Sequence, residues 1–321
     1  MSWRWPMPTN LSSICTYDGP SRTDDILESR VVYGEQPCLR IRSRVAAVTL
    51  NGSSSTCGRR GSSRVAVCMA GAARTFAMPA VYKSIWENLI GGLKADVDVF
   101  AVIDLGDALP KRQSGWTYPQ ARATEQRVAK ALSLLQPRMV ARWRDGCEKV
   151  QLNERCSFTD AFLQDSSNVL RSMAQPAAWD VCMSLIEARE LDVGTKYDWV
   201  VRTRPDLLWS RAHPPACALE PSVSALGEAS EDNHFVLPRR WAPSVMRGIH
   251  QEYAVCRGKR PFVNLEGWLV HQMHGQTGKP PKELDFGFVI QRASEVCNRK
   301  GEESRQCWFR RLASVEPRVP T

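Results

Sequence analysis

The chain has 321 residues, of which 43% are apolar and 24% charged, so it can bury the core of one large α/β domain or of two ordinary ones. No stretch approaches the roughly 18 uninterrupted apolar residues of a membrane span, and the eleven cysteines contain no C-x-x-C pair of the kind that binds zinc. The net charge of +9 favours acidic partners such as phosphates, nucleic acid or anionic lipid, although an arginine-rich genome or compartment explains it equally well.

Three segments follow one another along the chain. Residues 1–62 are rich in Ser, Arg, Gly and Pro and end in the linker-like run "NGSSSTCGRRGSS", so we expect a flexible or weakly structured N-terminal segment. Residues 63–298 carry the periodic apolar pattern of a folded domain, and residues 299–321 form a basic C-terminal tail. The first residues lack the apolar region of a signal peptide, so we expect a soluble protein or the soluble domain of an anchored one.

The folded segment alternates between strand and helix patterns. Apolar runs at 64–71, 96–107, 138–143 and 197–204 predict buried strands, the second of them ending in Asp104 and Asp107. Amphipathic stretches at 79–92, 121–135 and 177–191 predict the helices between them. Pro79 suits the first turn of its helix, and Gly91 can end it. A strand at 234–241, helices at 242–254 and 265–275, and a final strand at 284–292 follow. This order predicts an α/β fold with a mostly parallel central sheet flanked by helices, in a single domain.

The cysteines give a weak indication of the compartment. The spacings of Cys147/Cys156 and of Cys297/Cys307 suit local disulfides in an oxidising lumen. Cys68 and Cys182 lie in apolar runs, and we expect them to be ordinary core residues.

Polar residues follow three of the predicted strands. The loop "AGAARTF" contains Gly71 and Arg74, "DLGD" contains Asp104, and "RTRPD" follows the fourth strand. Because ligands of doubly wound sheets bind beyond the carboxyl ends of the strands, we expect these loops to meet at one site. The first loop suits a diphosphate, but it has neither the dinucleotide-binding nor the P-loop glycine pattern, and an ordinary turn is the alternative.

The segment "KYDWVVRTRPDLLWS" places charge in an otherwise apolar strand. Arg202, Arg204 and Asp206 have a spacing of two, which puts them on one face of an extended strand, and Pro205 interrupts that strand. Asp206 is a candidate ligand for Mg²⁺ or Mn²⁺, and the arginines are candidates for phosphate binding. The alternative is a buried salt-bridge network with carboxylates such as Asp104.

Glu266 opens the predicted helix at 265–275, where the helix dipole stabilises a carboxylate, so its role is either to cap the helix or to act on an acceptor hydroxyl. The basic residues lack the aromatic interleaving and the signatures of nucleic-acid-binding domains, so we do not expect a nucleic-acid partner.

These motifs together carry a family resemblance. "VAVCMAGAARTF", "VYKSIWENLIGGLKADVDVFAVID" and "YDWVVRTRPDLLW", followed by "EDNHFVLPRRW", "NLEGWLVHQM" and "FGFVIQR", resemble a group of GT-A-like glycosyltransferases with an Arg-x-Arg-x-Asp motif. The likeness covers residues 64–293. It implies a Rossmann-like GT-A fold and transfer of a sugar from a nucleotide-diphosphate donor to a glycan or protein acceptor. The alternative is a non-catalytic nucleotide- or carbohydrate-binding module of the same fold.

The resemblance also implies roles for single residues. Asp206 matches the Asp of the motif and would bind a divalent metal, Mn²⁺ or Mg²⁺, or the donor diphosphate. Arg74 would bind phosphate together with Gly71, Arg202 and Arg204, and Asp104 would contact the nucleotide. Asp232 and Glu266 would contact the acceptor or serve as the base. The chain departs from the family in having no D-x-D, because Arg204 stands where the first Asp would be. A Golgi or other secretory lumen is implied, with the cytoplasm as the alternative.

Overall fold

The central element of the protein is an eight-stranded sheet with the order β1-β6-β3-β2-β7-β10-β9-β11. It is seen in a computed structural model that describes residues 39–43, 63–105, 111–113, 116–118, 123–143, 149–156, 158–222, 224–226, 232–256 and 264–290. The four inner strands are β2 (Arg64–Ala72), β3 (Asp96–Asp104), β6 (Met139–Trp143) and β7 (Trp199–Thr203). They are parallel to one another, which confirms the α/β architecture and the mostly parallel centre of the sheet.

The order of the inner strands creates a topological switch point. The chain runs outward from β2 through β3 to β6, and then returns to the other side of β2 to form β7. The direction of winding therefore reverses between β2 and β7. In open α/β sheets such a reversal opens a crevice beyond the carboxyl ends of the two strands, and ligands bind there. The loops that contain Arg74 and Asp206 leave β2 and β7 at this end.

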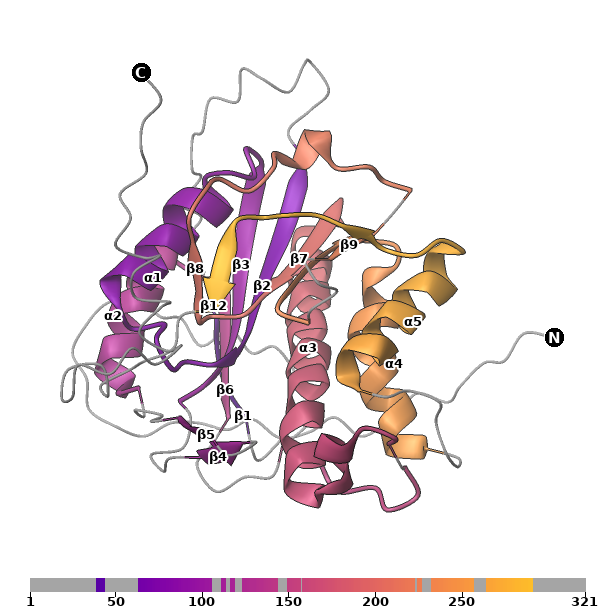
Figure 1. Cartoon of the computed structure of the whole chain (residues 1–321). Coiled ribbons are helices and arrows are strands. Elements are labelled where there is room, and N and C mark those ends of the chain that lie inside the picture. Colours follow the sequence, from indigo (N-terminus) through magenta and orange to yellow (C-terminus); the bar gives the residue numbers. More distant parts are fainter. Residues whose placement is uncertain are drawn as a thin grey trace, which may run out of the picture.

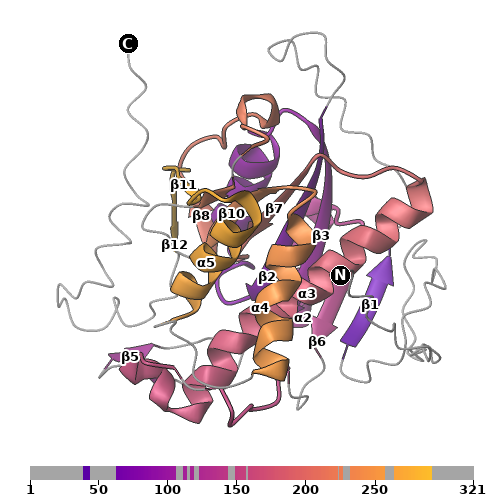
Figure 2. The ribbon, with the colours of Figure 1, turned by 90° about the vertical axis from the view of Figure 1, so that its right-hand side faces the viewer.

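The edges of the sheet are antiparallel. On one side β10 (His234–Pro238) pairs with β7 and is followed by β9 (Ala225–Leu226) and β11 (Lys282–Glu283). On the other side β1 (Leu39–Ser43) pairs with β6 (Figure 2). Segment 1–62, which we expected to be weakly structured, thus contributes a strand. Its other residues before 63, and the tail 299–321, lie outside the described residues.

Helices cover both faces of the sheet (Figure 1). One face carries α1 (Pro79–Ser84), which continues as a π-helical segment at Ile85–Ile90, and α2 (Glu125–Leu135). The other face carries α3 (Ser166–Val193), α4 (Ala242–Val255) and α5 (Leu265–Thr277). The alternation of side chains along the strands explains this arrangement, because Val65 and Val67 of β2 pack toward α1 and α2, while Ala66 and Cys68 pack toward α3.

The helix ends follow local chemistry. Thr124, Asp165 and Asn264 cap α2, α3 and α5, since each side chain accepts a hydrogen bond from a backbone N–H of the first turn. Gly194 and Gly278 end α3 and α5 in the left-handed conformation. The helix α3 has 28 residues and begins well before the expected residue 177, with Pro176 in its interior.

Several short strands lie outside the main sheet. Within the final strand that we expected at 284–292, the structure describes residues up to 290 and shows β12 (Phe288–Ile290), which begins later than expected. It pairs with β8 (Leu207–Trp209) in a separate two-stranded sheet. A second small sheet joins β4 (Lys111–Gln113) and β5 (Trp116–Tyr118). Two 3₁₀ turns complete the described elements, at Ala161–Gln164 and Ala216–Ala218.

The disulfides correct the sequence-based expectations. Cys68 and Cys182 are not free core residues but form a buried disulfide between β2 and α3. Cys156 pairs with Cys256, 100 residues away, and not with Cys147. Spacing along the chain misled the prediction because α3 and α4 bring distant segments together in space. Cys147, Cys297 and Cys307 lie outside the described residues.

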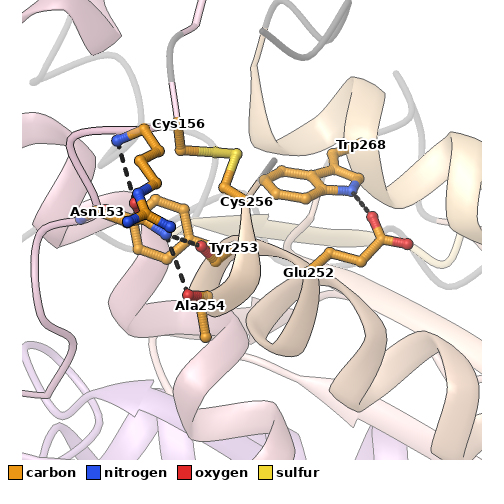
Figure 3. The surroundings of a disulfide bond; sticks show 8 residues. Asn153, Cys156, Glu252, Tyr253, Ala254, Cys256 and Trp268 are labelled. Carbon is orange, nitrogen blue, oxygen red and sulfur yellow. Dashed lines mark hydrogen bonds between the residues drawn. A yellow bond between two sulfur atoms is a disulfide. The ribbon is translucent and has the colours of Figure 1, made fainter. Parts of the chain in front are cut away.

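The Cys156–Cys256 bond fastens the end of α4 to the segment that precedes α3 (Figure 3). Next to it, the side-chain amide of Asn153 donates to the backbone carbonyls of Tyr253 and Ala254 at 2.8 and 3.1 Å. These carbonyls belong to the last turn of α4, where the helix itself supplies no partners. The disulfide and the amide therefore stabilise the same helix end.

Candidate functional site

The loop after β2 has an unusual backbone. Gly71 has a φ of +141°, and a Cβ at this position would lie 3.3 Å from Cδ of Pro205. Arg74 has a φ of +25°, which residues other than glycine seldom adopt. Such strained residues persist where the surrounding structure imposes them, and they cluster at ligand-binding sites. The close approach of Gly71 to Pro205 brings this loop against the "RTRPD" segment, as the topology predicted.

Asp206 is the centre of the interactions between the two loops. Its side chain is 1% exposed. Arg204 donates from Nε to Oδ1 and from Nη2 to Oδ2, both at 2.9 Å, which is the two-pronged geometry of a strong guanidinium–carboxylate pair. Arg74 donates from Nη1 to Oδ2 at 3.1 Å. Nη1 of Arg204 also donates to Oδ1 of Asn233, at 3.0 Å, and so links the site to the segment before β10.

Arg202 hydrogen-bonds elsewhere than the Arg204–Asp206 pair, although the charges of both residues act on it. The strand β7 ends at Thr203, so the spacing of two does not keep Arg202, Arg204 and Asp206 on one strand face as we expected. Arg202 is completely buried on the α3 side, where Nη2 donates to Oε1 of Gln175 at 3.3 Å. Its guanidinium carbon is 4.7 Å from the ring centroid of Trp179, within the range of a cation–π contact.

The surroundings of Arg202 disfavour its charged form. Burial lowers the pKa of Arg202 to about 9, and the charge of Arg204 also lowers it, whereas the carboxylates of Asp232 and Asp206 raise it. Two of its nitrogen atoms, Nε and Nη1, are buried without a hydrogen-bond partner. Arg142 and Arg189 each have one such nitrogen, whereas Arg202 has two and is completely buried.

Asp232 lies two residues before the start of β10 and is buried, and its charge acts on Arg202. Its Oδ2 atom has no hydrogen-bond partner. The structure therefore places Asp232 in the same electrostatic neighbourhood as the arginines, with one oxygen available to accept a proton or a hydrogen bond.

Asp104 is the last residue of β3, and its backbone oxygen accepts a hydrogen bond from the backbone N–H of Ala73 at 2.6 Å. This bond fixes the end of β3 against the loop of Arg74. The Asp104 side chain forms an ion pair with Lys149. Asp107, from the same predicted loop, lies outside the described residues.

Glu266 occupies the first turn of α5 and is half-buried. The arrangement around the helix end suits the dipole-stabilising role that we considered for Glu266.

The residues around Asp206 do not fit a divalent metal. Both of its oxygens accept hydrogen bonds from guanidinium groups, so its lone pairs are engaged by cations already. Among the residues that the structure describes, no group of three or more His, Cys, Asp and Glu side chains could hold a metal ion. Binding of Mn²⁺ or Mg²⁺ by Asp206 is therefore not supported by this geometry.

A pair of buried histidines escaped the sequence analysis. Nδ1 of His213 lies 2.7 Å from the backbone oxygen of Pro214 and so carries the proton that this bond needs. Nε2 of His213 is then an acceptor, and Nε2 of His234, 3.3 Å away, donates to it. Burial lowers the pKa of His213 to about 4 and that of His234 well below its ordinary value, so both rings are neutral. The polar residue at the start of the apolar run "HFVLP" was the available signal.

Comparison with known proteins adds no identity to this geometry. No protein-family model matches the chain, and no curated protein matches it significantly. Within the described part of the chain, no helix is long and apolar enough to cross a membrane. The assignment of function therefore depends on the arrangement of side chains at the switch point.

Proposed function

We propose that this chain is a glycosyltransferase with a GT-A-like fold, which moves a sugar from a nucleotide-diphosphate donor to a glycan or other acceptor hydroxyl. The observation that carries the proposal is the guanidinium cluster of Arg74, Arg202 and Arg204 at the switch point between β2 and β7. Crevices of this kind bind nucleotides, and guanidinium groups are well matched to phosphate oxygens.

The chemistry of transfer requires stabilisation of the leaving group. Negative charge develops on the donor diphosphate as the bond to the sugar breaks, and fixed cations directed at that charge lower the barrier. Arg74 and Arg204 are held in place by Asp206 and are suited to this role. Gly71 lets the backbone approach closely, and Asp104 at the end of β3 is the candidate contact for the nucleotide.

The acceptor hydroxyl must lose a proton during transfer. Of the two candidate bases, Asp232 has the stronger support, because its Oδ2 has no protein partner and it neighbours the arginine cluster. Glu266 is the second candidate, from the first turn of α5. General bases of this kind typically contribute about 10²–10⁴-fold to the rate.

A thermal-shift panel with UDP, GDP, CMP and their common sugar conjugates tests the proposal. A ligand at about 100 times its Kd adds roughly 2.7 kcal/mol to the free energy of unfolding, which is readily measured. We expect one nucleotide series to stabilise the chain and its sugar conjugate to release sugar to an acceptor. Stabilisation without release from any conjugate would instead favour a non-catalytic binding module, a function that the missing D-x-D supports.

A secretory or Golgi lumen is the compartment that we propose. Two disulfides, Cys68–Cys182 and Cys156–Cys256, lie among the described residues, and such bonds persist in oxidising compartments.

A further inference from the structure

We propose that guanidinium groups alone supply the anion-binding charge of this site, and that Asp206 is an internal counter-ion that positions Arg74 and Arg204, so that a diphosphate binds without a divalent metal. The inference rests on the proposed donor site and deepens it, because it assigns the way in which the site recognises its anion. It also changes the role of Asp206 from a metal ligand to a positioning residue.

Guanidinium groups already occupy both oxygens of the Asp206 carboxylate. Arg204 takes one position on each oxygen, and Arg74 takes a further position on Oδ2. A metal ion would have to displace a two-pronged guanidinium from a carboxylate that is only 1% exposed. The carboxylate would then leave two arginines, each itself largely buried, without their counter-charge. Such a loss of a partner within a buried pair is strongly unfavourable.

The charges of the guanidinium groups and of the carboxylates around them are not balanced. Among the residues that the structure describes, the guanidinium groups of Arg74, Arg202 and Arg204 interact with the carboxylates of Asp206 and Asp232. Asp104 acts only weakly on Arg74 and has its own partner in Lys149. The cluster therefore has an excess of positive charge, which repels a divalent cation and attracts a polyvalent anion.

Arg74 and Arg202 have N–H donors that the protein does not use. Nε of Arg74 and both Nε and Nη1 of Arg202 are buried without hydrogen-bond partners. Arg202 is completely buried, so these donors are not satisfied by bulk water, while the Arg74 side chain is 25% exposed and gives the cluster a side open to solvent. Burial and the charge of Arg204 also lower the pKa of Arg74, as expected of a cation that still lacks part of its counter-charge.

The ligand class follows from these features. An anion that accepts hydrogen bonds from Arg74 in the loop after β2 and from Arg202 in β7 must carry several oxygens and more than one charge, and a diphosphate does. The cations that such an anion needs are already present as guanidinium groups. A metal, whose usual function at such sites is to neutralise the diphosphate, is therefore not needed for binding.

Calorimetric titration of the full chain with inorganic pyrophosphate, first in EDTA and then with added Mn²⁺, tests this inference. We expect binding in EDTA. Arg74→Ala should weaken it by at least about tenfold, since it removes a charge-assisted bond. Arg240→Ala is the matched control, because Arg240 is exposed and follows Pro238, which pairs with Trp199 at the opposite end of β7. This variant removes the same charge and should leave the affinity within about twofold of the original.

Asp206→Asn distinguishes the two roles of Asp206 by the sign of its effect. As a counter-ion, Asp206 competes with the ligand for the arginines, so the variant should bind pyrophosphate in EDTA at least as tightly as the unchanged chain. In the transfer assay it should lower kcat more than it alters KM, because the guanidinium groups are less well ordered. As a metal ligand, Asp206 would instead be required for a binding that depends on Mn²⁺.

The outcomes separate this inference from the proposed function. Binding that requires Mn²⁺ in the unchanged chain would overturn the inference and leave the donor site in place, and this result does not depend on whether Asp206→Asn folds. An absence of binding with and without Mn²⁺, in a chain whose circular dichroism shows it to be folded, would overturn both. Binding in EDTA that Arg74→Ala abolishes would support both.

Discussion

Two networks of buried charge in this protein differ in how completely their groups are paired. In the first, Glu190 of α3 accepts two hydrogen bonds from Arg239, at 2.7 and 2.5 Å, and one from the backbone N–H of Tyr197 at 3.1 Å. In the same network Arg247 of α4 donates to both Asp180 and Glu187 of α3. In the second network, at the switch point, Arg202 keeps two nitrogen atoms without a partner.

The pKa values express this difference. Burial lowers the pKa of Arg247, but its hydrogen bonds to Glu187 and the charges of Glu187 and Asp180 outweigh burial, so the pKa lies above its ordinary value. The pKa of Arg202 falls to about 9, because its carboxylate neighbours do not compensate for burial. In a structural ion-pair network the buried donors and charges have partners within the protein, whereas in a ligand-binding network some of them are left for the ligand. This difference is the reason why we propose the switch-point cluster, and not the α3–α4 network, as the functional one.

Glu190→Gln is expected to have the largest effect. The variant leaves the largely buried guanidinium of Arg239 without its main counter-charge, which typically costs about 3–5 kcal/mol in the free energy of unfolding. Urea denaturation measures this loss. The control is Glu125→Gln, because the Glu125 side chain is 66% exposed in its pair with Arg142 and an exposed pair contributes about 1 kcal/mol or less. Equal effects of the two variants would mean that the Glu190 network is not a structural one.

The buried histidines extend the comparison to groups that remain neutral. Because the folded pKa of His213 is about 4 and its ordinary value is 6.5, the unfolded chain binds a proton in this range that the folded chain does not. The pKa of His234 is lowered in the same direction, by burial first and then by the neighbouring His213 and Arg202. The free energy of unfolding should therefore fall as the pH is lowered from about 6.5 to 4, by up to about 1.4 kcal/mol per pH unit for each histidine.

Urea denaturation at several pH values between 7 and 4 measures this slope, and the His213→Phe/His234→Phe variant is the comparison. Phenylalanine preserves the aromatic packing against Trp209 and Phe286 but does not titrate. The variant should lose the part of the pH dependence that the two histidines cause. The same slope in both proteins would show that carboxylates elsewhere cause it.

The sequence predicted the mostly parallel sheet and the approach of two loops better than the pairing of side chains between them. The alternation of strand and helix patterns predicted that β2, β3, β6 and β7 would be parallel, although it did not predict their order in the sheet. The meeting of the loops of Arg74 and Asp206 followed from that topology. The pairing of Asp206 with two arginines could not be predicted, because it depends on the turn that begins after Thr203 and on the strained loop at Arg74.

The prediction of the disulfide pairing was wrong for a related reason. Spacing along the chain favoured local pairs, whereas Cys156 is joined to Cys256 by the packing of α4 beside the segment before α3. The sequence shows where the cysteines lie along the chain, but not which of them are close in space. Residues that contact each other across elements, such as Gln175 with Arg202 and Asn233 with Arg204, carry no spacing that connects them.

Removal of the Cys156–Cys256 bond tests how far the α3–α4 region depends on covalent support in addition to ion pairs. The bond closes a loop of 100 residues in sequence separation, and it restricts the unfolded chain. We expect Cys156→Ser/Cys256→Ser to lower the free energy of unfolding by about 2–4 kcal/mol. Pyrophosphate affinity at the switch point should remain within about twofold in the folded variant, because charge there is unaltered. A loss of affinity would show that the two regions are coupled.

The smallest effect on stability is expected from Arg202→Met, and its comparison with Arg239→Met is the most direct test of the difference between the two networks. Arg239→Met should cost about 3–5 kcal/mol, because it leaves Glu190 buried without its partner. Arg202→Met removes a completely buried cation whose donors are incompletely paired, in a space lined by Trp179 and Phe235 that suits an apolar side chain. Loss of the attraction to Asp232 opposes this gain, so the free energy of unfolding should change by only about 1 kcal/mol in either direction. Pyrophosphate binding in EDTA should nevertheless weaken, because one of the three guanidinium groups is lost. If Arg202→Met were as destabilising as Arg239→Met, the switch-point cluster would be a structural network like the other, and its unused donors would not mark a binding site.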